Sequence, residues 1–246
     1  MFIPQKRKMK IENNKLLPTD LKAFLFDMDG VLYDSMPKHA KAWVHSFQSL
    51  GLEFNEYEAY MREGMTGSST INDIFGRQLN RTASEEECQR IYAEKAAYFE
   101  SLGTSSIISG VDTVLQLIRQ NNISIFLVTG SGQKSLLDKL EHSFPGVFQK
   151  ERMVTAYDVK KGKPDPEPYL MALQKGGLNP DQAIVVENAP LGVKSAVAAG
   201  IFTIAVNTGI LRDEELLNNG ANLLYHSMEE LLIDLPKILS NSFIDM

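Results

Sequence analysis

Residues 23–30 have the sequence AFLFDMDG, and this stretch decides the fold. Its four consecutive apolar residues are typical of a buried parallel strand, because both faces of such a strand are covered. The chain then opens into a loop at Asp27, Asp29 and Gly30, so both acids stand at the carboxyl end of the strand. In open α/β sheets, this edge is where ligands bind. Two carboxylates this close repel each other, so we expect them to hold a cation or to attack a substrate.

From residue 109 onward, apolar strand patterns alternate with helical patterns. Predicted strands cover residues 123–128, 153–156, 183–186 and 202–206. Predicted helices cover residues 111–118, 133–142, 167–175 and 190–199, and Ser227 with Glu230 caps a last one. This alternation predicts an α/β fold with a doubly wound parallel sheet.

Residues 37–105 contain helical patterns only. Helices are predicted at residues 37–50, 56–62 and 69–79, and Ser84 with Glu87 forms a capping box that begins another. We therefore expect an all-helical domain at 37–105, inserted into a core domain made of 21–36 and 106–246. Residues 1–20 are expected to form an N-terminal extension.

The composition is that of an ordinary globular protein, with 246 residues, 43% hydrophobic and 23% charged, which suffices for a core plus a smaller domain. The net charge of −6 gives no general attraction for nucleic acid. No run of 18 apolar residues predicts a membrane span. The single cysteine, Cys88, lies on a helical face and fits a reducing compartment. We expect a cytoplasmic monomer.

Four segments at predicted strand ends or in loops carry unusual polar groups: Asp27 with Asp29, Thr129-Gly130-Ser131, Lys163, and Glu187-Asn188. Taken singly, Thr129 could cap the following helix, Lys163 could be a solvated cation, and the acid-amide pair could be a turn. Gathered at one edge of a sheet, they are typical of a site for phosphate and magnesium.

Charge assigns the roles in such a site. An anionic Asp27 can attack a phosphoryl group only if cations cancel the repulsion. Magnesium prefers about six oxygen ligands and keeps several waters. We expect Asp27, the backbone carbonyl of Asp29 and Asn188 to bind it, with Glu187 close by or bound through water. Lys163 would supply a second positive charge.

The remaining roles concern the phosphoryl oxygens and the proton. The Thr129 hydroxyl and the backbone N–H groups of Gly130 and Ser131 are expected to hold the phosphoryl oxygens, since small residues let the main chain come close. Asp29 is expected to protonate the leaving oxygen and then to deprotonate the attacking water. Residues 130–135, GSGQKS, are similar to a nucleotide P-loop, but Gln133 breaks the required Gly-Lys-Ser sequence.

The same segments resemble the four motifs of the haloacid dehalogenase-like superfamily. The resemblance rests on DMDGVL at 27–32 with Asp34 and Ser35, VTGS at 128–131, GKP at 162–164 with Pro166, and ENAPLGV at 187–193. It covers residues 21–240 and implies a Rossmann-like core, a mobile helical cap, magnesium and an aspartyl-phosphate intermediate on Asp27. Many relatives have an acid where Asn188 stands, so this site should bind magnesium more weakly.

The helical insertion resembles that of the β-phosphoglucomutase and phosphatase subfamily. In its mutases, the loop matching 63–67 usually presents an arginine to a sugar phosphate, whereas this chain has Glu63 and Thr66 and no arginine there. The resemblance places His39 and Lys95 facing the site. An acid at Glu63 favours a small substrate whose second phosphate is already bound to magnesium. The chain is most similar to inorganic pyrophosphatase members of this subfamily.

Three hypotheses follow. The first is a magnesium-dependent phosphohydrolase acting on pyrophosphate or another small phosphate. The second is a β-phosphoglucomutase that uses the same nucleophile to convert β-glucose 1-phosphate to glucose 6-phosphate. The third is a catalytically silent binding or regulatory protein, against which the intact acid pair argues.

Overall fold

The computed structural model describes residues 16–131 and 134–240, and most of the expected N-terminal extension lies outside these ranges. Its centre is a parallel sheet with the strand order β3-β2-β1-β4-β5-β6. The strands are β1 (Ala23–Phe26), β2 (Ser124–Val128), β3 (Met153–Val154), β4 (Ala183–Glu187), β5 (Phe202–Val206) and β6 (Leu223–Tyr225). The chain winds outward from β1 in both directions, which confirms the predicted doubly wound, Rossmann-like α/β fold.

The register of β1 brings the predicted segments together. Phe26 pairs with Leu127 on β2 and with Val186 on β4. The next residue of each segment therefore lies at the same height on the carboxyl edge of the sheet: Asp27, Val128 and Glu187. Since β1 lies in the middle of the sheet, Asp27 is flanked on both sides by the segments that continue β2 and β4.

The two faces of the sheet pack into separate hydrophobic clusters, because successive side chains of a strand point to opposite faces. Phe24 and Phe26 belong to the cluster under α5 (Val111–Gln120), α6 (Lys134–Ser143) and α10 (Met228–Leu239). Ala23 and Leu25 belong to the cluster under α7 (Glu167–Gly176) and α8 (Pro190–Ala198). Full burial of a residue such as Leu25 or Phe26 contributes about 1.5–3 kcal/mol.

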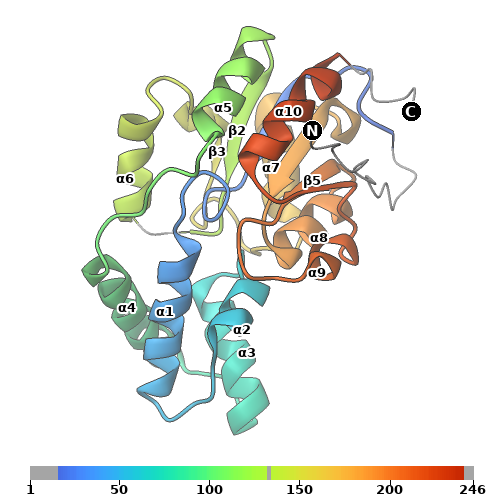
Figure 1. The fold of residues 1–246 in the computed structure, drawn as a ribbon. Helices are drawn as coiled ribbons and strands as arrows, with labels where there is room; N and C mark the ends of the chain where they lie inside the picture. Colours follow the sequence, from blue (N-terminus) through green and yellow to red (C-terminus); the bar gives the residue numbers. More distant parts are fainter. Residues whose placement is uncertain (1–15, 132–133, 241–246) are drawn as a thin grey trace, which may run out of the picture.

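The residues between β1 and α5 form four further helices, which lie together below the sheet in Figure 1. They are α1 (Met36–Gln48), α2 (Glu56–Met61), α3 (Gly67–Leu79) and α4 (Glu85–Ser101), and the capping box of Ser84 and Glu87 is present. A cluster around Trp43, Phe47 and Ile71 holds them together, with Cys88 packed at its side. We call α1–α4 the helical insertion.

The two segments that connect the helical insertion to the sheet lie side by side. The backbone N–H of Asp34 donates to the carbonyl of Ser106 at 2.9 Å. Tyr33 and Ile107 form an isolated antiparallel bridge next to it. The chain therefore enters and leaves the helical insertion at neighbouring points.

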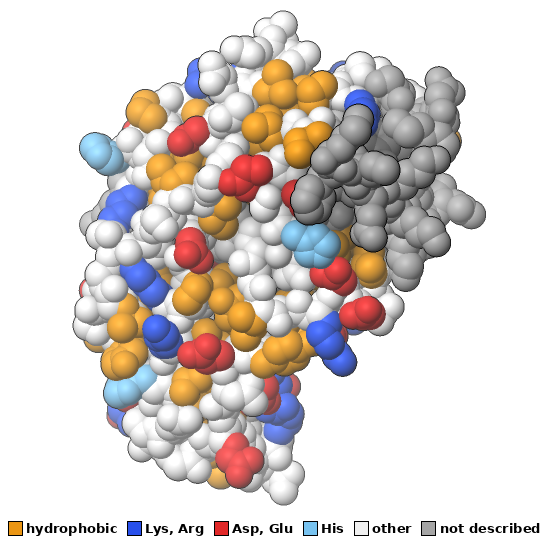
Figure 2. Space-filling view, viewed as in Figure 1, with side chains coloured by type: hydrophobic (Ala, Val, Ile, Leu, Met, Phe, Trp, Pro, Cys, Tyr) orange, Lys and Arg blue, Asp and Glu red, His pale blue; other side chains and the backbone are white. Residues whose placement is uncertain are grey.

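The face shown in Figure 2 mixes acidic, basic and hydrophobic side chains. Basic groups do not gather into one extended area there, which agrees with the net charge of −6. Within the described ranges, no helix has both the length and the hydropathy needed to cross a bilayer.

Candidate active site

Lys163 joins two carboxylates at the centre of the sheet edge. Its Nζ atom donates to Oδ1 of Asp27 and to Oε1 of Glu187, each at 2.6 Å, and to the carbonyl of Val128 at 3.1 Å. The Lys163, Asp27 and Glu187 side chains are all buried. These three buried groups are stabilised by their hydrogen bonds to one another, because a buried charge without a partner would be costly.

Burial and charge act together on these groups. Burial raises the pKa of Asp27 well above its usual value; Lys163 opposes this effect, and Glu187 and Asp29 add to it. Burial alone would lower the pKa of Lys163, but Asp27 and Glu187 raise it above its ordinary range. Lys163 therefore remains an ammonium group, and Asp27 needs further positive charge to act as an anion.

Glu187 is saturated by donors from the protein. Its Oε1 atom accepts from Lys163 and from the hydroxyl of Tyr169 at 2.8 Å. Its Oε2 atom accepts from the backbone N–H groups of Asn188 at 2.9 Å and Ala189 at 3.2 Å. Each oxygen of Glu187 thus accepts two hydrogen bonds, and the side chain orients Lys163; a place for Glu187 near the metal, or bound to it through water, stays a prediction.

Asp29 is held by Ser35, just before α1, and by His39 on α1, which in turn contacts Lys95 on α4. Its Oδ1 atom accepts from the hydroxyl of Ser35 at 2.6 Å and lies 3.2 Å from Nε2 of His39. The ammonium group of Lys95 donates to Nδ1 of His39 at 2.7 Å. The proton of a neutral His39 ring is then on Nε2 and points to Asp29. The structure thus brings His39 to Asp29 and Lys95 to His39, and their contact with substrate stays a prediction.

The pKa of Asp29 is shifted in the opposite direction from that of Asp27. Burial raises the pKa of Asp29, but His39, Ser35 and Lys95 outweigh it and hold the pKa below its usual value. Burial, helped by Lys95, lowers the pKa of His39. Burial also lowers the pKa of Lys95 to about 8, and its Nζ lies between 5.2 and 5.8 Å from the ring centres of Trp43, Tyr92 and Phe99.

One buried side-chain oxygen suits a magnesium ion. Oδ1 of Asn188 is buried and has no hydrogen-bond partner, and the same holds for Oδ2 of Asp29, which remains available for proton transfer. Gly30, with a φ of +80°, brings the backbone so close that a Cβ there would lie 2.0 Å from Nδ2 of Asn188. Residues 16–131 and 134–240 hold no group of three or more His, Cys, Asp or Glu side chains arranged around an ion. A magnesium ion would therefore depend on Asn188, a backbone carbonyl and water as well.

The charge balance of the site points the same way. Burial raises the pKa of Glu63 to about 8, and Asp29 and Glu187 add to the effect. The raised pKa values mean that Asp27 and Glu63 would keep their protons in these surroundings. A divalent cation would favour their ionised forms, so the donor set and the charge both fit magnesium.

The predicted phosphate loop meets the helical insertion directly. The hydroxyl of Thr129 accepts from the backbone N–H of Ser131 at 3.0 Å. A Cβ on Gly130 would lie 2.8 Å from the carbonyl oxygen of Gly64, and a Cβ on Gly64 would lie 2.8 Å from Cδ of Lys163. Glycine is required at both positions for this approach. Residues 132 and 133 of the sequence similar to a P-loop lie outside the described residues.

A small cavity lies where these parts meet. It has a volume of about 30 Å³ and is lined by Asp29, His39, Trp43, Glu63, Met65, Gly67, Tyr92, Lys95, Gly130 and Ser131. Thr66 does not line it, although the sequence suggested substrate contact. Its hydroxyl instead caps α3 by accepting from the N–H of Ser69 at 3.2 Å.

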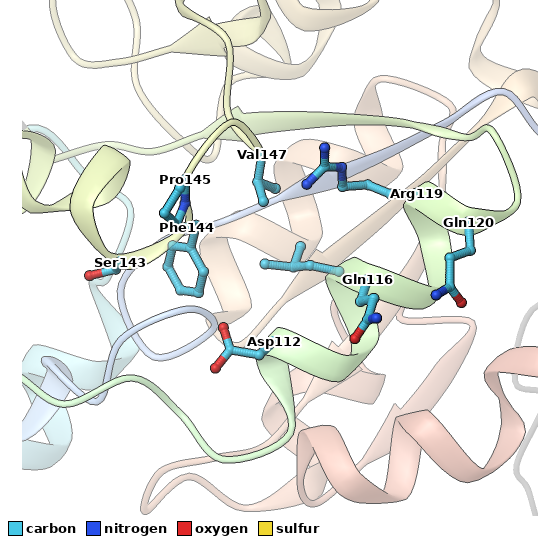
Figure 3. Close-up of a pocket in the computed structure, with 9 residues that line it drawn as sticks. Asp112, Gln116, Arg119, Gln120, Ser143, Phe144, Pro145 and Val147 are labelled. Atoms are coloured by element: carbon cyan, nitrogen blue, oxygen red, sulfur yellow. The ribbon is translucent and has the colours of Figure 1, made fainter.

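A larger cavity of about 520 Å³ lies elsewhere, between α5 and the segment that follows α6 (Figure 3). Leu115, Phe144 and Val147 line it together with polar residues such as Asp112 and Arg119. None of the predicted site residues lines this cavity. Six of the predicted site residues line the smaller cavity instead: Asp29, His39, Glu63, Lys95, Gly130 and Ser131.

Two residues with clear roles in this geometry were not assigned from the sequence. Ser35 donates to Asp29 and Tyr169 donates to Glu187. Ser35 stands just before α1, close enough in sequence to the acid pair to have suggested a contact. Tyr169 sits within a helix, and nothing in the local pattern distinguishes it from an ordinary core tyrosine.

Comparison with known proteins places this site in a family. A model of haloacid dehalogenase-like hydrolases matches residues 21–200. Hexitol phosphatase A of Escherichia coli strain K12 is 32% identical over 212 residues, covering 86% of this chain and 94% of that protein. A solved structure from Bacteroides vulgatus, provisionally assigned as a β-phosphoglucomutase, is 53% identical, with a TM-score of 0.87 and 90% of each chain covered. The β-phosphoglucomutase of Clostridium difficile is 27% identical, with a TM-score of 0.76 over 92% of this chain and 100% of that one. This chain therefore belongs to the haloacid dehalogenase-like hydrolase family.

Proposed function

We propose that this protein is a magnesium-dependent phosphohydrolase that acts on inorganic pyrophosphate or another small phosphate. The observation that carries the proposal is the lining of the cavity beside Asp29, to which the helical insertion contributes Glu63 and Lys95 and no arginine. Lys95 can face a leaving phosphate, whereas no guanidinium is offered there to a sugar phosphate.

In the proposed reaction, a carboxylate oxygen of Asp27 bonds to phosphorus while the bond from phosphorus to the leaving oxygen breaks. When the negatively charged substrate enters the site, Asp29, whose pKa is otherwise held low, would take up a proton from water, and it then gives this proton to that oxygen. Asp29 then takes a proton from a water molecule, which attacks the phosphorus of the aspartyl phosphate and releases phosphate and the Asp27 carboxylate. Asp29 suits this exchange, because Ser35 and His39 fix one of its oxygens while the other remains available.

Positive charge must accompany the attack. Asp27, the backbone carbonyl of Asp29 and Asn188 would hold magnesium, which when bound supplies charge that offsets the repulsion between two anions. Lys163 keeps its ammonium group beside Asp27 throughout. The Thr129 hydroxyl and the N–H groups of Gly130 and Ser131 would hold the phosphoryl oxygens.

The helical insertion would act as a cap, with 37–105 as its domain and 21–36 plus 106–246 as the core. In the proposal, Glu63 and Lys95 determine the substrate. Lys95 faces the leaving phosphate, and the Glu63 carboxylate would attract the magnesium ion that accompanies a second phosphate group. We also propose a monomer in the cytoplasm, where the single Cys88 would stay reduced.

A β-phosphoglucomutase is the second candidate, because two similar solved structures carry that assignment. The 63–67 loop argues against it, since it presents no arginine to a sugar phosphate. Arg62, which precedes the loop, donates to Asp73 at 2.8 Å. Its guanidinium is therefore engaged within the helical insertion.

One experiment separates the candidates. Purified protein is given pyrophosphate, a panel of phosphate esters or β-glucose 1-phosphate, each with and without magnesium, and both phosphate release and glucose 6-phosphate formation are measured. We expect magnesium-dependent phosphate release that is fastest with pyrophosphate. Rapid formation of glucose 6-phosphate without net phosphate release would overturn the proposal in favour of the mutase.

A further inference from the structure

The loop after β5 is hydrogen-bonded to the backbone beside the acid pair. The hydroxyl of Thr208 donates to the carbonyl oxygen of Gly30 at 2.6 Å, although the two residues are 178 positions apart. Gly30 follows Asp29 directly, and its own N–H donates to the carbonyl of Tyr33 at 2.7 Å. Thr208 therefore fixes one end of the short backbone segment that carries Asp29.

The loop itself is braced from within the core. The N–H of Asn207 donates to the carbonyl of Tyr225 at 2.7 Å. Its side-chain amide donates to the carbonyl of Leu211 and to Oδ1 of Asp213, each at 2.8 Å. We call residues 207–211 the brace loop. These bonds close it into a compact turn between β5 and α9 (Asp213–Leu217).

The brace loop also packs against the helical insertion, next to α2 (Figure 1). Leu211 is buried in the hydrophobic cluster of the insertion. A Cβ on Gly209 would lie 2.5 Å from the ring of Tyr60 on α2. Close by, the hydroxyl of Tyr57 donates to Glu215 at 3.1 Å. The loop is thus seated between α2 on one side and the Asp29-Gly30 backbone on the other.

We propose that Thr208 is a positioning residue that holds the Gly30 carbonyl, and with it the Asp29 backbone, in place for magnesium, and that α2 seats the brace loop through the contact of Tyr60 with Gly209. The inference rests on the proposed magnesium site but not on the identity of the substrate. Binding of magnesium alone therefore tests it separately from hydrolysis.

The test compares Thr208→Val, which keeps the shape of the side chain and removes the donor, with Thr208→Ser, which keeps the donor. Magnesium binding is measured by titration calorimetry without substrate, and kcat and KM are measured in parallel. We expect Thr208→Val to weaken magnesium binding and to lower kcat by about fivefold each, as for one lost hydrogen bond. KM for the substrate at saturating magnesium should change less than kcat, and Thr208→Ser should stay within twofold of wild type.

Thr203→Val is the matched control. Thr203 is buried in β5 and its hydroxyl donates to the carbonyl of Ile201 at 3.1 Å. This variant loses a comparable hydrogen bond in the strand that precedes the brace loop and should keep wild-type magnesium affinity. Magnesium binding by Thr208→Val within twofold of wild type, or an equal loss in Thr203→Val, would overturn the positioning role.

The seating of the brace loop is tested by Gly209→Ala, which forces the loop and the Tyr60 ring apart. We expect weaker magnesium binding, and recovery when Tyr60→Leu is added to make room. Gly76→Ala in α3 is the control, because a Cβ there meets nothing within 4 Å. Unchanged magnesium affinity in a folded Gly209→Ala variant would contradict the part assigned to α2.

Discussion

Lys163 lies 2.6 Å from Asp27 through its Nζ atom, and both side chains are buried. The segment before α7 thus carries a fixed positive charge to the end of β1, 136 positions away in sequence. The same ammonium group also binds Glu187, so three segments converge on one nitrogen. A substitution at Lys163 therefore tests both the structure of the site and its proposed chemistry.

Lys163→Met should remove both the activity and part of the stability. The substitution leaves Asp27 and Glu187 as buried acids without their cation, which typically costs about 3–5 kcal/mol. Loss of a charged donor at the reacting oxygens should lower kcat by about 100-fold or more. Phosphate release and urea unfolding measure the two effects. Lys161→Met, two residues away and 74% exposed at its side chain, should change neither, and equal losses in the two variants would contradict the assigned role.

Glu63→Ala should alter substrate preference more than overall activity. Because Glu63 lines the cavity beside Asp29, the account expects it to act on the leaving group and not on the phosphoryl group that is transferred. The kcat/KM for pyrophosphate should fall by about tenfold relative to that for an aryl phosphate, a difference of about 1.4 kcal/mol. Parallel assays on the two substrates measure the ratio, and equal losses on both would remove Glu63 from substrate choice.

Gly130→Ala should prevent the helical insertion from reaching the phosphate loop. The new Cβ would lie 2.8 Å from the carbonyl oxygen of Gly64, and backbone atoms cannot move aside as a flexible side chain can. We expect kcat to fall by about 10- to 100-fold, since small displacements in a reacting site are costly. Gly76→Ala should leave kcat unchanged and stabilise α3 by up to about 1 kcal/mol. Full activity of Gly130→Ala would argue that catalysis does not need this contact.

His226 should make a small contribution to stability that depends on pH. Its hydrogen bond with Asp213 raises the pKa of the ring, and partial burial opposes the shift. A raised pKa means that the stabilisation is complete below the unfolded-state value of about 6.5 and is lost as pH rises through the folded-state value. His226→Gln should therefore cost about 0.3–0.5 kcal/mol at pH 5.5 and almost nothing at pH 9, because the side chain is 59% exposed. Urea unfolding at both pH values measures this, and a larger loss at pH 9 would show that the sign is wrong.

Much of the fold was predictable because its signals are local. The apolar run at 23–26 and the alternation after residue 109 specify strands and helices by periodicity, and the structure confirms them within one or two residues at most ends. The two elements that were missed, β6 and α9, have only three and five residues. Strands and helices this short are stabilised by packing against neighbours, so their own sequence carries little periodicity.

The position of the site residues was predictable to a similar extent. Strand-end motifs place Asp27, Asp29 and Lys163 together because parallel strands share one carboxyl edge. The part assigned to Glu187 could not be foreseen, since its four hydrogen bonds come partly from Tyr169 on a distant helix. The cap formed by Thr66 could not be foreseen for a related reason: a threonine in a loop can contact a ligand or cap a helix, and only the course of α3 shows the cap.

The proposed reaction requires that Asp27 becomes phosphorylated, and chemical trapping detects this intermediate. Enzyme mixed with pyrophosphate and magnesium is quenched within milliseconds and treated with borohydride, which reduces an aspartyl phosphate to homoserine, and the peptides are sequenced by mass spectrometry. We expect homoserine at position 27 and nowhere else, and none in Asp27→Asn. Turnover at the wild-type rate by Asp27→Asn, or homoserine at another aspartate, would show that Asp27 is not the nucleophile.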